Sequence, residues 1–306
     1  MDETDTPKSS LSDHAGRELA RILAKPLAPG LHIVATPIGN LGDITLRALC
    51  VLAAADVVYC EDTRHSRTLM SHFGLATKMQ AYHEHNAERE RPRIIARLEA
   101  GERIALISDA GTPLISDPGY KLVRDVVAVG YAVYALPGPC AAVAALTVAG
   151  LPTDSFMFAG FLPPKSGQRQ ARLKELVAVP ATLVFYEAPT RVAEAIADMA
   201  AVLGDRSCAI ARELSKLHEE VQRGSLSALA AELSGTELRG EIAIVVAPPL
   251  DAVAADADIT AALVAALDVS STRDAVRMVA ERLGVAKTRV YDLAMDLKRV
   301  DPEQQD

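Results

Sequence analysis

The sequence predicts an α/β fold with two domains and a small helical module at its C-terminus. Short apolar runs alternate with helical segments over the first 150 residues, which is typical of βαβ units and a mostly parallel sheet. After Gly150 the regular alternation ends, and several short apolar runs follow one another closely, which favours a mixed sheet. The length of 306 residues fits two domains of ordinary size with a small addition.

The N-terminal α/β domain is expected over residues 30–150, after a polar tail and a short amphipathic stretch in residues 1–29. Its strands are expected at residues 31–35, 57–60, 104–107 and 131–136. Helices are expected from Asp43 to Ala54, from Pro118 with Asp117 as N-cap, and at residues 63–73, 88–100 and 140–149. Gly74, Gly101 and Gly150 follow three of these helices, as residues that end helices do.

The second α/β domain is expected over residues 151–248. Its strands are predicted at 155–162, 182–186, 208–214, 220–223 and 241–246, and its helices at 168–179, 189–203 and 226–233. No helix is predicted between Cys208 and Arg223, so part of this sheet should be antiparallel. Residues 248–259, with the sequence PPLDAVAADADI, are interpreted as a linker, and two or three short helices are expected from Thr260 to Arg299.

The composition excludes several classes of protein. Half of the residues are hydrophobic and 24% are charged, which excludes a disordered chain and a small disulfide-stapled one. Four cysteines form no CxxC pair and lie among apolar residues, so they are expected to be reduced and mostly buried. The net charge of −8 opposes the binding of nucleic acid, so the protein would need a local basic surface to bind RNA.

A cytoplasmic location is expected. The acidic N-terminus contains no apolar segment that resembles a secretory or transit signal. Residues 126–153 carry no charge, but Pro137-Gly138-Pro139 divides them into two pieces that are each too short to span a bilayer as a helix. They are interpreted as a buried strand followed by a buried helix, with no contact to a membrane.

Glycine, proline and small polar residues follow four consecutive predicted strands. The four segments are TPIGNLGD at 36–43, EDTR at 61–64, SDAGTPLISDPG at 108–119 and PGPCA at 137–141. In open α/β sheets, ligands bind beyond the carboxyl ends of the parallel strands. Glycine lets the backbone approach a ligand closely, and exposed amides bind oxygen atoms. These segments therefore predict a ligand site at one edge of the first sheet.

Several well-known site motifs are missing. No GxGxxG follows the first strand, which argues against a Rossmann dinucleotide site and against the common methyltransferase fold, and neither a P-loop nor a GxSxG elbow occurs. His83 and His85 are two residues apart and could lie on one face of a strand. No third metal ligand accompanies them at a convincing spacing, so no metal site is expected.

Six segments together resemble the ribosomal RNA small subunit methyltransferase I family, which belongs to the tetrapyrrole-methylase superfamily. They are LHIVATPIGNLGDITLRAL, EDTRHSRTL, ALISDAGTPLISDPGYKLV, LPGPCAAVAAL, FYEAPTRV and ARELSKLHEEVQRGSL, in this order between Leu31 and Leu226. The resemblance implies a two-domain fold that binds S-adenosylmethionine in the cleft between its domains. It also implies 2′-O-methylation of a cytidine ribose near the decoding centre of 16S rRNA, within the assembled small ribosomal subunit, by a homodimer that needs no metal.

The same resemblance assigns residues to cofactor binding. They come from the loops after the first, third and fourth predicted strands and from one strand end of the second domain: Pro37, Gly39, Asp109, Ala110, Gly111, Thr112, Ile115, Pro137, Cys140, Ala141 and Tyr186. Thr112 stands where many superfamily members have Asp, and Cys140 replaces a commoner hydroxyl residue, so those two side-chain contacts differ from the superfamily pattern.

Acidic residues at strand ends are the candidates for a general base, because a ribose hydroxyl is a weak acid. Asp62, Asp109 and Glu187 meet this condition, and Glu187 is preferred over Asp62 as the catalytic residue. Asp62 has the alternative role of capping the helix that starts at Thr63, and Glu187 that of favourable charge at a helix N-terminus.

RNA contacts are expected from local clusters of basic residues. Residues 271–300 contain seven Lys and Arg against four Asp and Glu, and residues 162–176 contain Lys165, Arg169, Arg172 and Lys174 against Glu175. The predicted substrate-binding residues are Arg64, Arg67, Lys165, Arg191, Lys287 and Arg289. Two alternatives stay open, namely a methylase of a tetrapyrrole or another small molecule, and a non-catalytic RNA-binding assembly protein.

Overall fold

A computed structural model of the chain describes residues 10–249, 256–283, 285 and 287–300. The chain forms two compact units. The larger comprises residues 1–177 and 181–247, and the smaller comprises residues 178–180 and 248–306. Within the described residues, no helix is long and apolar enough to cross a membrane.

The first sheet is parallel throughout, as the sequence predicts. Its strands are β1 (Gly30–Val34), β2 (Val57–Cys60), β3 (Met79–Ala81), β4 (Arg103–Leu106) and β5 (Val133–Leu136), in the order β3-β2-β4-β1-β5. Strand β3 was not predicted, because it is only three residues long and half-buried and so lacks the apolar run that marks the other strands. The carboxyl ends of all five strands meet at one edge of the sheet.

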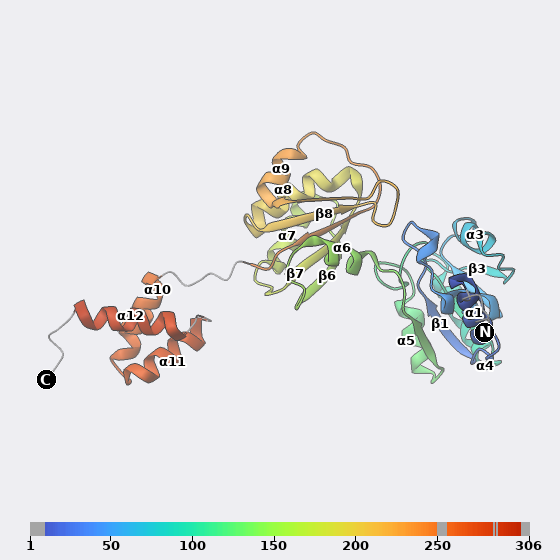
Figure 1. Ribbon diagram of the computed structural model, residues 1–306, viewed down its shortest axis with the longest axis horizontal. Coiled ribbons are helices and arrows are strands. Elements are labelled where there is room, and N and C mark those ends of the chain that lie inside the picture. Colours follow the sequence, from blue (N-terminus) through green and yellow to red (C-terminus); the bar gives the residue numbers. More distant parts are fainter. Residues whose placement is uncertain (1–9, 250–255, 284, 286, 301–306) are drawn as a thin grey trace, which may run out of the picture. The chain divides into compact units, whose positions relative to one another are not determined.

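Helices cover both faces of this sheet (Figure 1). Helices α2 (Leu46–Ala54) and α3 (Thr63–His72) share one apolar core with strand residues such as Val58 and Cys60. Helices α4 (Ala87–Glu99) and α5 (Tyr120–Ala128) share another with Val57 and Tyr59. Successive strand residues point to opposite faces, so strands buried on both sides read as continuous apolar runs.

Two predicted helix starts are wrong. Asp43 ends a short 3₁₀ turn (Leu41–Asp43), and the N-cap of α2 is Thr45, whose hydroxyl accepts from the Ala48 amide at 3.1 Å. Helix α5 begins after Gly119, so Asp117 does not cap it. Asp62 does cap α3, and its carboxylate accepts from the Arg64 amide at 2.8 Å.

The second sheet is mixed, as predicted. Its strands are β6 (Phe156–Phe161), β7 (Thr182–Glu187), β8 (Ser207–Arg212), β9 (Glu220–Ser225) and β10 (Ile242–Val246), in the order β6-β7-β10-β8-β9. Only the β6–β7 pair is parallel. Helices α7 (Ser166–Leu176), α8 (Val192–Leu203) and α9 (Leu226–Glu232) pack side by side, and a 3₁₀ turn (Pro189–Arg191) precedes α8.

Helix α6 (Ala141–Ala149) links the two sheets. It follows β5 of the first sheet, yet its buried residues Ala145 and Leu146 share a core with Val184, Ala209 and Val245 of the second sheet. Gly150 ends the helix in the left-handed conformation, with φ of 73°. One helix thereby fixes the end of the first sheet against the face of the second.

The amphipathic stretch predicted near the N-terminus is a helix, α1 (Leu11–Leu23), which packs against α2 and buries none of its residues completely. Ser10 and Asp13 form a capping box at its start. The first nine residues of the predicted tail lie outside the described residues. All four cysteines are free, and Cys50, Cys60 and Cys208 are buried.

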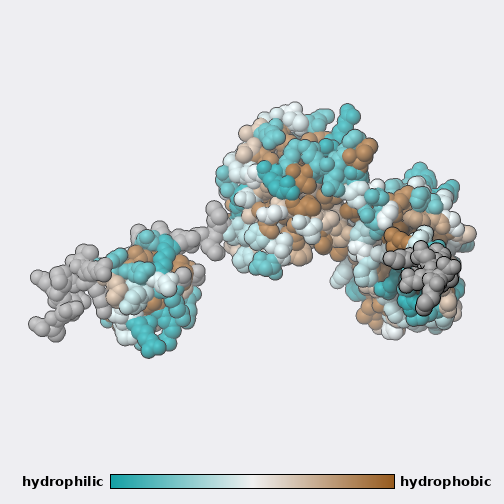
Figure 2. Space-filling view, viewed as in Figure 1, coloured by the Kyte–Doolittle hydropathy of each residue, from teal (hydrophilic) through white to brown (hydrophobic). Residues whose placement is uncertain are grey.

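The described residues of the smaller unit form three helices with their own core. They are α10 (Asp256–Leu267), α11 (Thr272–Leu283) and α12 (Lys287–Val300), packed around residues that include Leu263, Val279 and Val290. The predicted linker extends too far, because residues 256–259 are helical and Ile259 is fully buried. Hydrophilic side chains cover much of the visible face of these helices (Figure 2).

Arg169, which the sequence predicts as part of a basic surface in residues 162–176, forms a buried ion pair instead. Arg169 of α7 is 1% exposed, and its Nε lies 2.6 Å from Asp198 of α8. Ser166 and Gln170 also donate to the Asp198 carboxylate, at 3.0 and 2.7 Å. Arg169 therefore holds α7 against α8 and does not offer its charge to RNA.

Removing one partner of this pair should destabilise the protein strongly. Asp198→Ala leaves a buried guanidinium without its main counter-ion, which typically costs about 3–5 kcal/mol in the free energy of unfolding. The control is Glu194→Ala, which removes a partner 3.4 Å from Arg169 whose side chain is 72% exposed, and it should cost at most about 1 kcal/mol. Urea unfolding measures both, and equal effects would contradict this role for Asp198.

Candidate functional site

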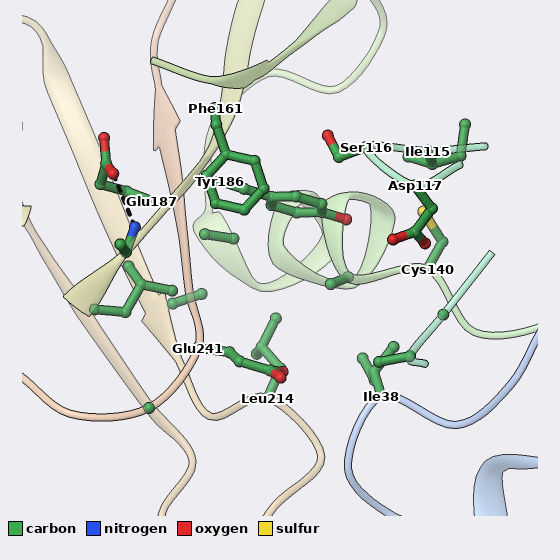
Figure 3. Close-up of a pocket in the computed structure, with 18 of the residues that line it drawn as sticks. Ile38, Ile115, Ser116, Asp117, Cys140, Phe161, Tyr186, Glu187, Leu214 and Glu241 are labelled. Carbon is green, nitrogen blue, oxygen red and sulfur yellow. Dashed lines mark hydrogen bonds between the residues drawn. The ribbon is translucent and has the colours of Figure 1, made fainter. Parts of the chain in front are cut away.

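A pocket of about 330 Å³ lies where the two sheets approach each other (Figure 3). One side comes from segments that follow strands of the first sheet, and the other from strand ends and loops of the second sheet. The lining residues are Ile38, Ala110, Gly111, Thr112, Ile115, Ser116, Asp117, Cys140 and Ala141 on the first side, and Phe161, Tyr186, Glu187, Ala188, Pro189, Ala211, Leu214, Gly240, Glu241, Ile242 and Ala243 on the second.

Backbone hydrogen bonds tie the strand-end loops of the first sheet together. Thr36 and Gly111 exchange two of them, with N–O distances of 2.8 and 3.0 Å. The Thr112 hydroxyl donates to the Pro139 carbonyl at 2.9 Å, which joins the loop after β4 to the turn after β5. Gly111 has a φ of +79°, and a Cβ there would lie 3.3 Å from Ile38. A larger residue at 111 would be strained and would crowd the pocket wall.

Tyr186 closes the centre of the pocket. Its hydroxyl accepts a hydrogen bond from the Ala142 amide at 2.9 Å, in the first turn of α6, where Cys140 provides no side-chain cap. Phe158 and Phe161 pack edge-on against its ring, with centroids 4.9 and 5.7 Å away. Burial raises the pKa of the Tyr186 phenol, which therefore stays protonated at neutral pH.

Two strained loops border the pocket. Among the described residues, four non-glycine residues have a positive φ, namely Leu114, Ser116, Glu213 and Ser215. Such residues cost about 1–3 kcal/mol each and cluster at functional sites. The first pair brackets Ile115, and the second brackets Leu214, both of which line the pocket. The strain is therefore located where the walls of the pocket are shaped.

The second loop also holds the two sheets together. The stem of Lys216 packs on Gly39, where any Cβ would collide with it, and its ammonium group lies 2.8 Å from Glu213 and 3.2 Å from Glu241. The Ser215 hydroxyl donates to Asp43. These contacts bring the loop after β8 against the loop after β1.

The pocket contains acidic groups and no basic ones. None of the described residues that line it is Lys, Arg or His, whereas Asp117, Glu187 and Glu241 are acidic. Burial raises the pKa of Asp117 to about 6, the charges of Glu61 and Asp109 act in the same direction, and a hydrogen bond from Ser108 opposes them. This arrangement suits a neutral or positively charged ligand and disfavours a phosphate inside the pocket.

Seven of the predicted cofactor-binding residues line this pocket: Ala110, Gly111, Thr112, Ile115, Cys140, Ala141 and Tyr186. Pro37, Gly39 and Asp109 line a separate cavity of about 110 Å³, together with His65 and the buried Ser66. Pro137 lines neither cavity and is exposed.

Arginines hold both of the predicted catalytic carboxylates. Glu187 is 3% exposed, and its Oε1 accepts from the Ala188 amide and from Arg191 Nε, each at 2.8 Å. Asp62 lines neither cavity, and its Oδ2 lies 2.7 Å from Arg64. The hydrogen bond from Arg64 lowers the pKa of Asp62 to about 2, which makes this carboxylate a weak base.

The predicted substrate-binding residues fall into two groups. Arg67, Lys165 and Lys287 are exposed. Arg64, Arg191 and Arg289 are engaged in ion pairs, with Asp62, Glu187 and Asp256 respectively, at N–O distances of 2.7, 2.6 and 2.6 Å. Within the described residues, no group of three His, Cys, Asp or Glu side chains has the arrangement of a metal site.

Sequence reasoning missed Asp117 and most of the second wall. Asp117 was interpreted as a helix cap, although it lies in a strand-end loop that was itself selected. Leu214 and residues 240–243 lie beside antiparallel strands, and the strand-end rule for parallel sheets does not select them. For Leu214 and residues 240–243 the sequence therefore carries no strand-end signal, whereas Tyr186 and Glu187 of the same wall are predicted.

Comparisons with known proteins agree with this architecture. Residues 30–230 match the family described as Tetrapyrrole (Corrin/Porphyrin) Methylases. Ribosomal RNA small subunit methyltransferase I of Mesorhizobium japonicum is 49% identical over 92% of this chain and 97% of its own length. The protein of the same name from Pseudomonas aeruginosa is 46% identical over 87% of this chain and 96% of its own.

Solved structures share the fold at low sequence identity. A cobalt precorrin-4 methyltransferase has a TM-score of 0.54 and 16% identity, covering 71% of this chain and 94% of its own. The uroporphyrin-III C-methyl transferase of Thermus thermophilus, complexed with S-adenyl homocysteine, has a TM-score of 0.51 and 20% identity, covering 71% and 96%.

The hydrogen bond between Tyr186 and α6 should contribute measurably to stability. Tyr186→Phe keeps the ring but leaves the Ala142 amide without its acceptor, so the free energy of unfolding should fall by about 1–2 kcal/mol. The control is Tyr120→Phe at a side chain that is 68% exposed, which should change it by less than about 0.5 kcal/mol. Denaturant unfolding of the two variants gives the comparison, and a neutral Tyr186→Phe would refute the role.

Proposed function

The chain belongs to the tetrapyrrole (corrin/porphyrin) methylases and, among them, to the ribosomal RNA small subunit methyltransferase I family, and from this premise we propose that it methylates ribosomal RNA of the small subunit with S-adenosylmethionine. The observation that carries the proposal is the pocket at the strand ends, which is built from close-packed backbone and whose described lining residues include no Lys, Arg or His. The high identity over nearly the full length of named relatives supports the same substrate.

The pocket fits S-adenosylmethionine in size and charge. A cavity of about 330 Å³ lies in the range of small-molecule sites. Ile38, Ile115, Leu214 and Phe161 offer apolar surface for the adenosyl group, and the backbone at residues 110–112 and 240–243 offers polar groups for its edges. The acidic lining complements the positive charge of the sulfonium.

When bound, S-adenosylmethionine supplies a methyl group on a positively charged sulfur, which makes the methyl carbon open to displacement by an oxygen nucleophile. The protein has to hold the acceptor oxygen in line with the carbon–sulfur bond and keep water out. Positioning of this kind can contribute about 7–11 kcal/mol to lowering a barrier. The linked loops at 36–39, 110–115 and 137–141 provide a rigid frame, since hydrogen bonds join them to one another.

The finer proposal is that the acceptor is the 2′-hydroxyl of a cytidine ribose in the decoding region of 16S rRNA. Its support is the six-segment resemblance to the family. The acidic pocket agrees with it in one respect, because it favours the entry of a neutral sugar hydroxyl while the phosphates stay outside.

Phosphate contacts are proposed at exposed basic residues. Arg67 lies on α3 and Lys165 immediately precedes α7, and both side chains are exposed in the larger unit. Lys287 is exposed at the start of α12 in the smaller unit, within residues 271–300, which contain seven Lys and Arg against four Asp and Glu. Arg64, Arg191 and Arg289 would have to exchange their present carboxylate partners for phosphate.

We also propose a homodimer that acts on the assembled subunit in the cytoplasm, without a metal. Helix α5, beside the edge strand β5, exposes Tyr120 and Val127, apolar side chains that a second copy would cover. Two other functions, a small-molecule methylase and a non-catalytic assembly protein, are separated from this proposal by the first experiment below.

Incubation of the protein and labelled S-adenosylmethionine with small ribosomal subunits should add one methyl group to one cytidine ribose of 16S rRNA. Nuclease digestion and mass mapping of the rRNA would locate it, and a uroporphyrinogen is tested in parallel. Methylation of the tetrapyrrole alone would favour the small-molecule alternative. Cofactor binding with no transfer to any substrate would favour the assembly protein.

Gly111→Val should weaken S-adenosylmethionine binding at least tenfold, because the new side chain crowds the wall between Ile38 and Pro139. The matched control is Gly74→Val, at a glycine with a similar positive φ of +64° and no atoms near its Cβ position, which should leave affinity within about twofold. Calorimetry measures both affinities. Unchanged affinity in Gly111→Val would remove this loop from the cofactor site.

A further inference from the structure

Three acidic side chains line the pocket, and they differ in their partners. The Glu187 carboxylate is buried and bonded to Arg191 and to the Ala188 amide, and Glu241 has Lys216 at 3.2 Å. For Asp117, no basic side chain among the described residues lies within ion-pair distance. Among the described residues that line the pocket, Asp117 is therefore the acid whose charge no cation neutralises.

Asp117 is oriented into the pocket. In Figure 3 its carboxylate lies beside Cys140, and the hydroxyl end of Tyr186 points toward it from the opposite wall. The Glu187 carboxylate lies at the other end of the pocket in the same view and points away from its centre. Asp117 can therefore meet a ligand that fills the middle of the cavity.

The local backbone places Asp117 there at a cost. Leu114 and Ser116 have φ of 74° and 65°, and Gly119 has a φ of 135° with Leu106 and Leu114 closely packed around its Cβ position. If Asp117 simply capped α5, no left-handed residues would be needed before it. Backbone strain of this kind persists where the surrounding structure requires a side chain in one place.

The groups that face Asp117 also suit a proton acceptor. Glu61 follows β2 and Asp109 follows β4, and both charges raise the Asp117 pKa, as burial does more strongly. The Ser108 hydroxyl lowers it, and Tyr186 faces it in the protonated form. The result, a pKa of about 6, leaves the carboxylate ionised at neutral pH and yet basic enough to take a proton.

We propose that Asp117 is the catalytic general base of the methyl transfer. The inference rests on the proposed function and deepens it. The Asp117 carboxylate takes the proton of the acceptor hydroxyl while the oxygen lone pair forms the new bond to the methyl carbon. The electron pair of the broken carbon–sulfur bond stays on sulfur, which becomes a neutral thioether. The carboxylic acid then returns its proton to water.

The test compares Asp117→Asn with Asp117→Glu and with Asp154→Asn, a control at an exposed aspartate. In single-turnover methylation of small-subunit rRNA, Asp117→Asn should be about 10²–10⁴-fold slower, and Asp117→Glu should recover part of the rate. Calorimetric affinity for S-adenosylmethionine should fall much less than the rate, because Asp117 is one of three acidic residues that line the pocket. The wild-type rate should rise with pH and level off above about pH 6, and this inflection should disappear in Asp117→Asn.

A readout without turnover is the pH dependence of stability. The folded-state pKa of Asp117 lies above its unfolded value of 3.8, so the folded protein binds more protons than the unfolded chain between about pH 4 and 6. Wild-type stability should therefore fall as the pH rises through this window, relative to Asp117→Asn, and the difference should be constant above it.

Three outcomes would overturn the proposal. They are a wild-type rate in Asp117→Asn, a loss of cofactor affinity equal to the loss of rate, which would mark a carboxylate that binds the cofactor's ammonium group, and an identical pH dependence of stability in both proteins. A wild-type protein that binds the cofactor but methylates no rRNA would instead overturn the proposed function, so the two failures are distinguishable.

Discussion

The hydrogen bond from the Ala142 amide to the Tyr186 hydroxyl is the interaction on which the site depends. It joins the first turn of α6, the helix that follows β5 of the first sheet, to Tyr186 near the end of β7 in the second sheet. The same helix buries its apolar face against the second sheet, so an apolar core lies next to the hydrogen bond. The two walls of the pocket are thereby fixed at one distance, with Tyr186 between them.

Electrostatics then determines what the pocket accepts. The acids that the sequence offers are mostly neutralised locally, Asp62 by Arg64, Glu187 by Arg191 and Glu241 by Lys216. Arg64 and Arg191, which a count of charges would assign to RNA binding, neutralise these acids. Arg169 joins two helices through its ion pair with Asp198. Inside the pocket, Asp117 has no basic partner among the described residues, and outside it Arg67, Lys165 and Lys287 are exposed. This separation suits a positively charged cofactor inside and a phosphate backbone outside.

The architecture of the larger unit follows from the order of its segments. Parallel strands buried on both faces are nearly uniform apolar runs, and their carboxyl ends carry the glycine and proline residues that shape binding loops, so the sequence alone identifies the strand-end segments. Strand β3 and the helix starts at Thr45 and Gly119 are not identifiable from the sequence. Local preferences for a short half-buried strand, or for one cap residue over another, are smaller in free energy than the contribution of tertiary packing, which decides between them.

The sequence by itself determined the fold class, the parallel and mixed sheets, and one wall of the pocket, since these depend on apolar periodicity and on local turn residues. Seven of the eleven residues that the resemblance assigns to cofactor binding line the pocket, and six of them belong to the wall formed by segments after strands of the first sheet. Only the tertiary structure decided which charges are free. Whether an acid such as Asp117 or Glu187 has a basic partner depends on contacts between strands and loops distant in the chain, and on how deeply each is buried, and neither quantity is encoded in local spacing.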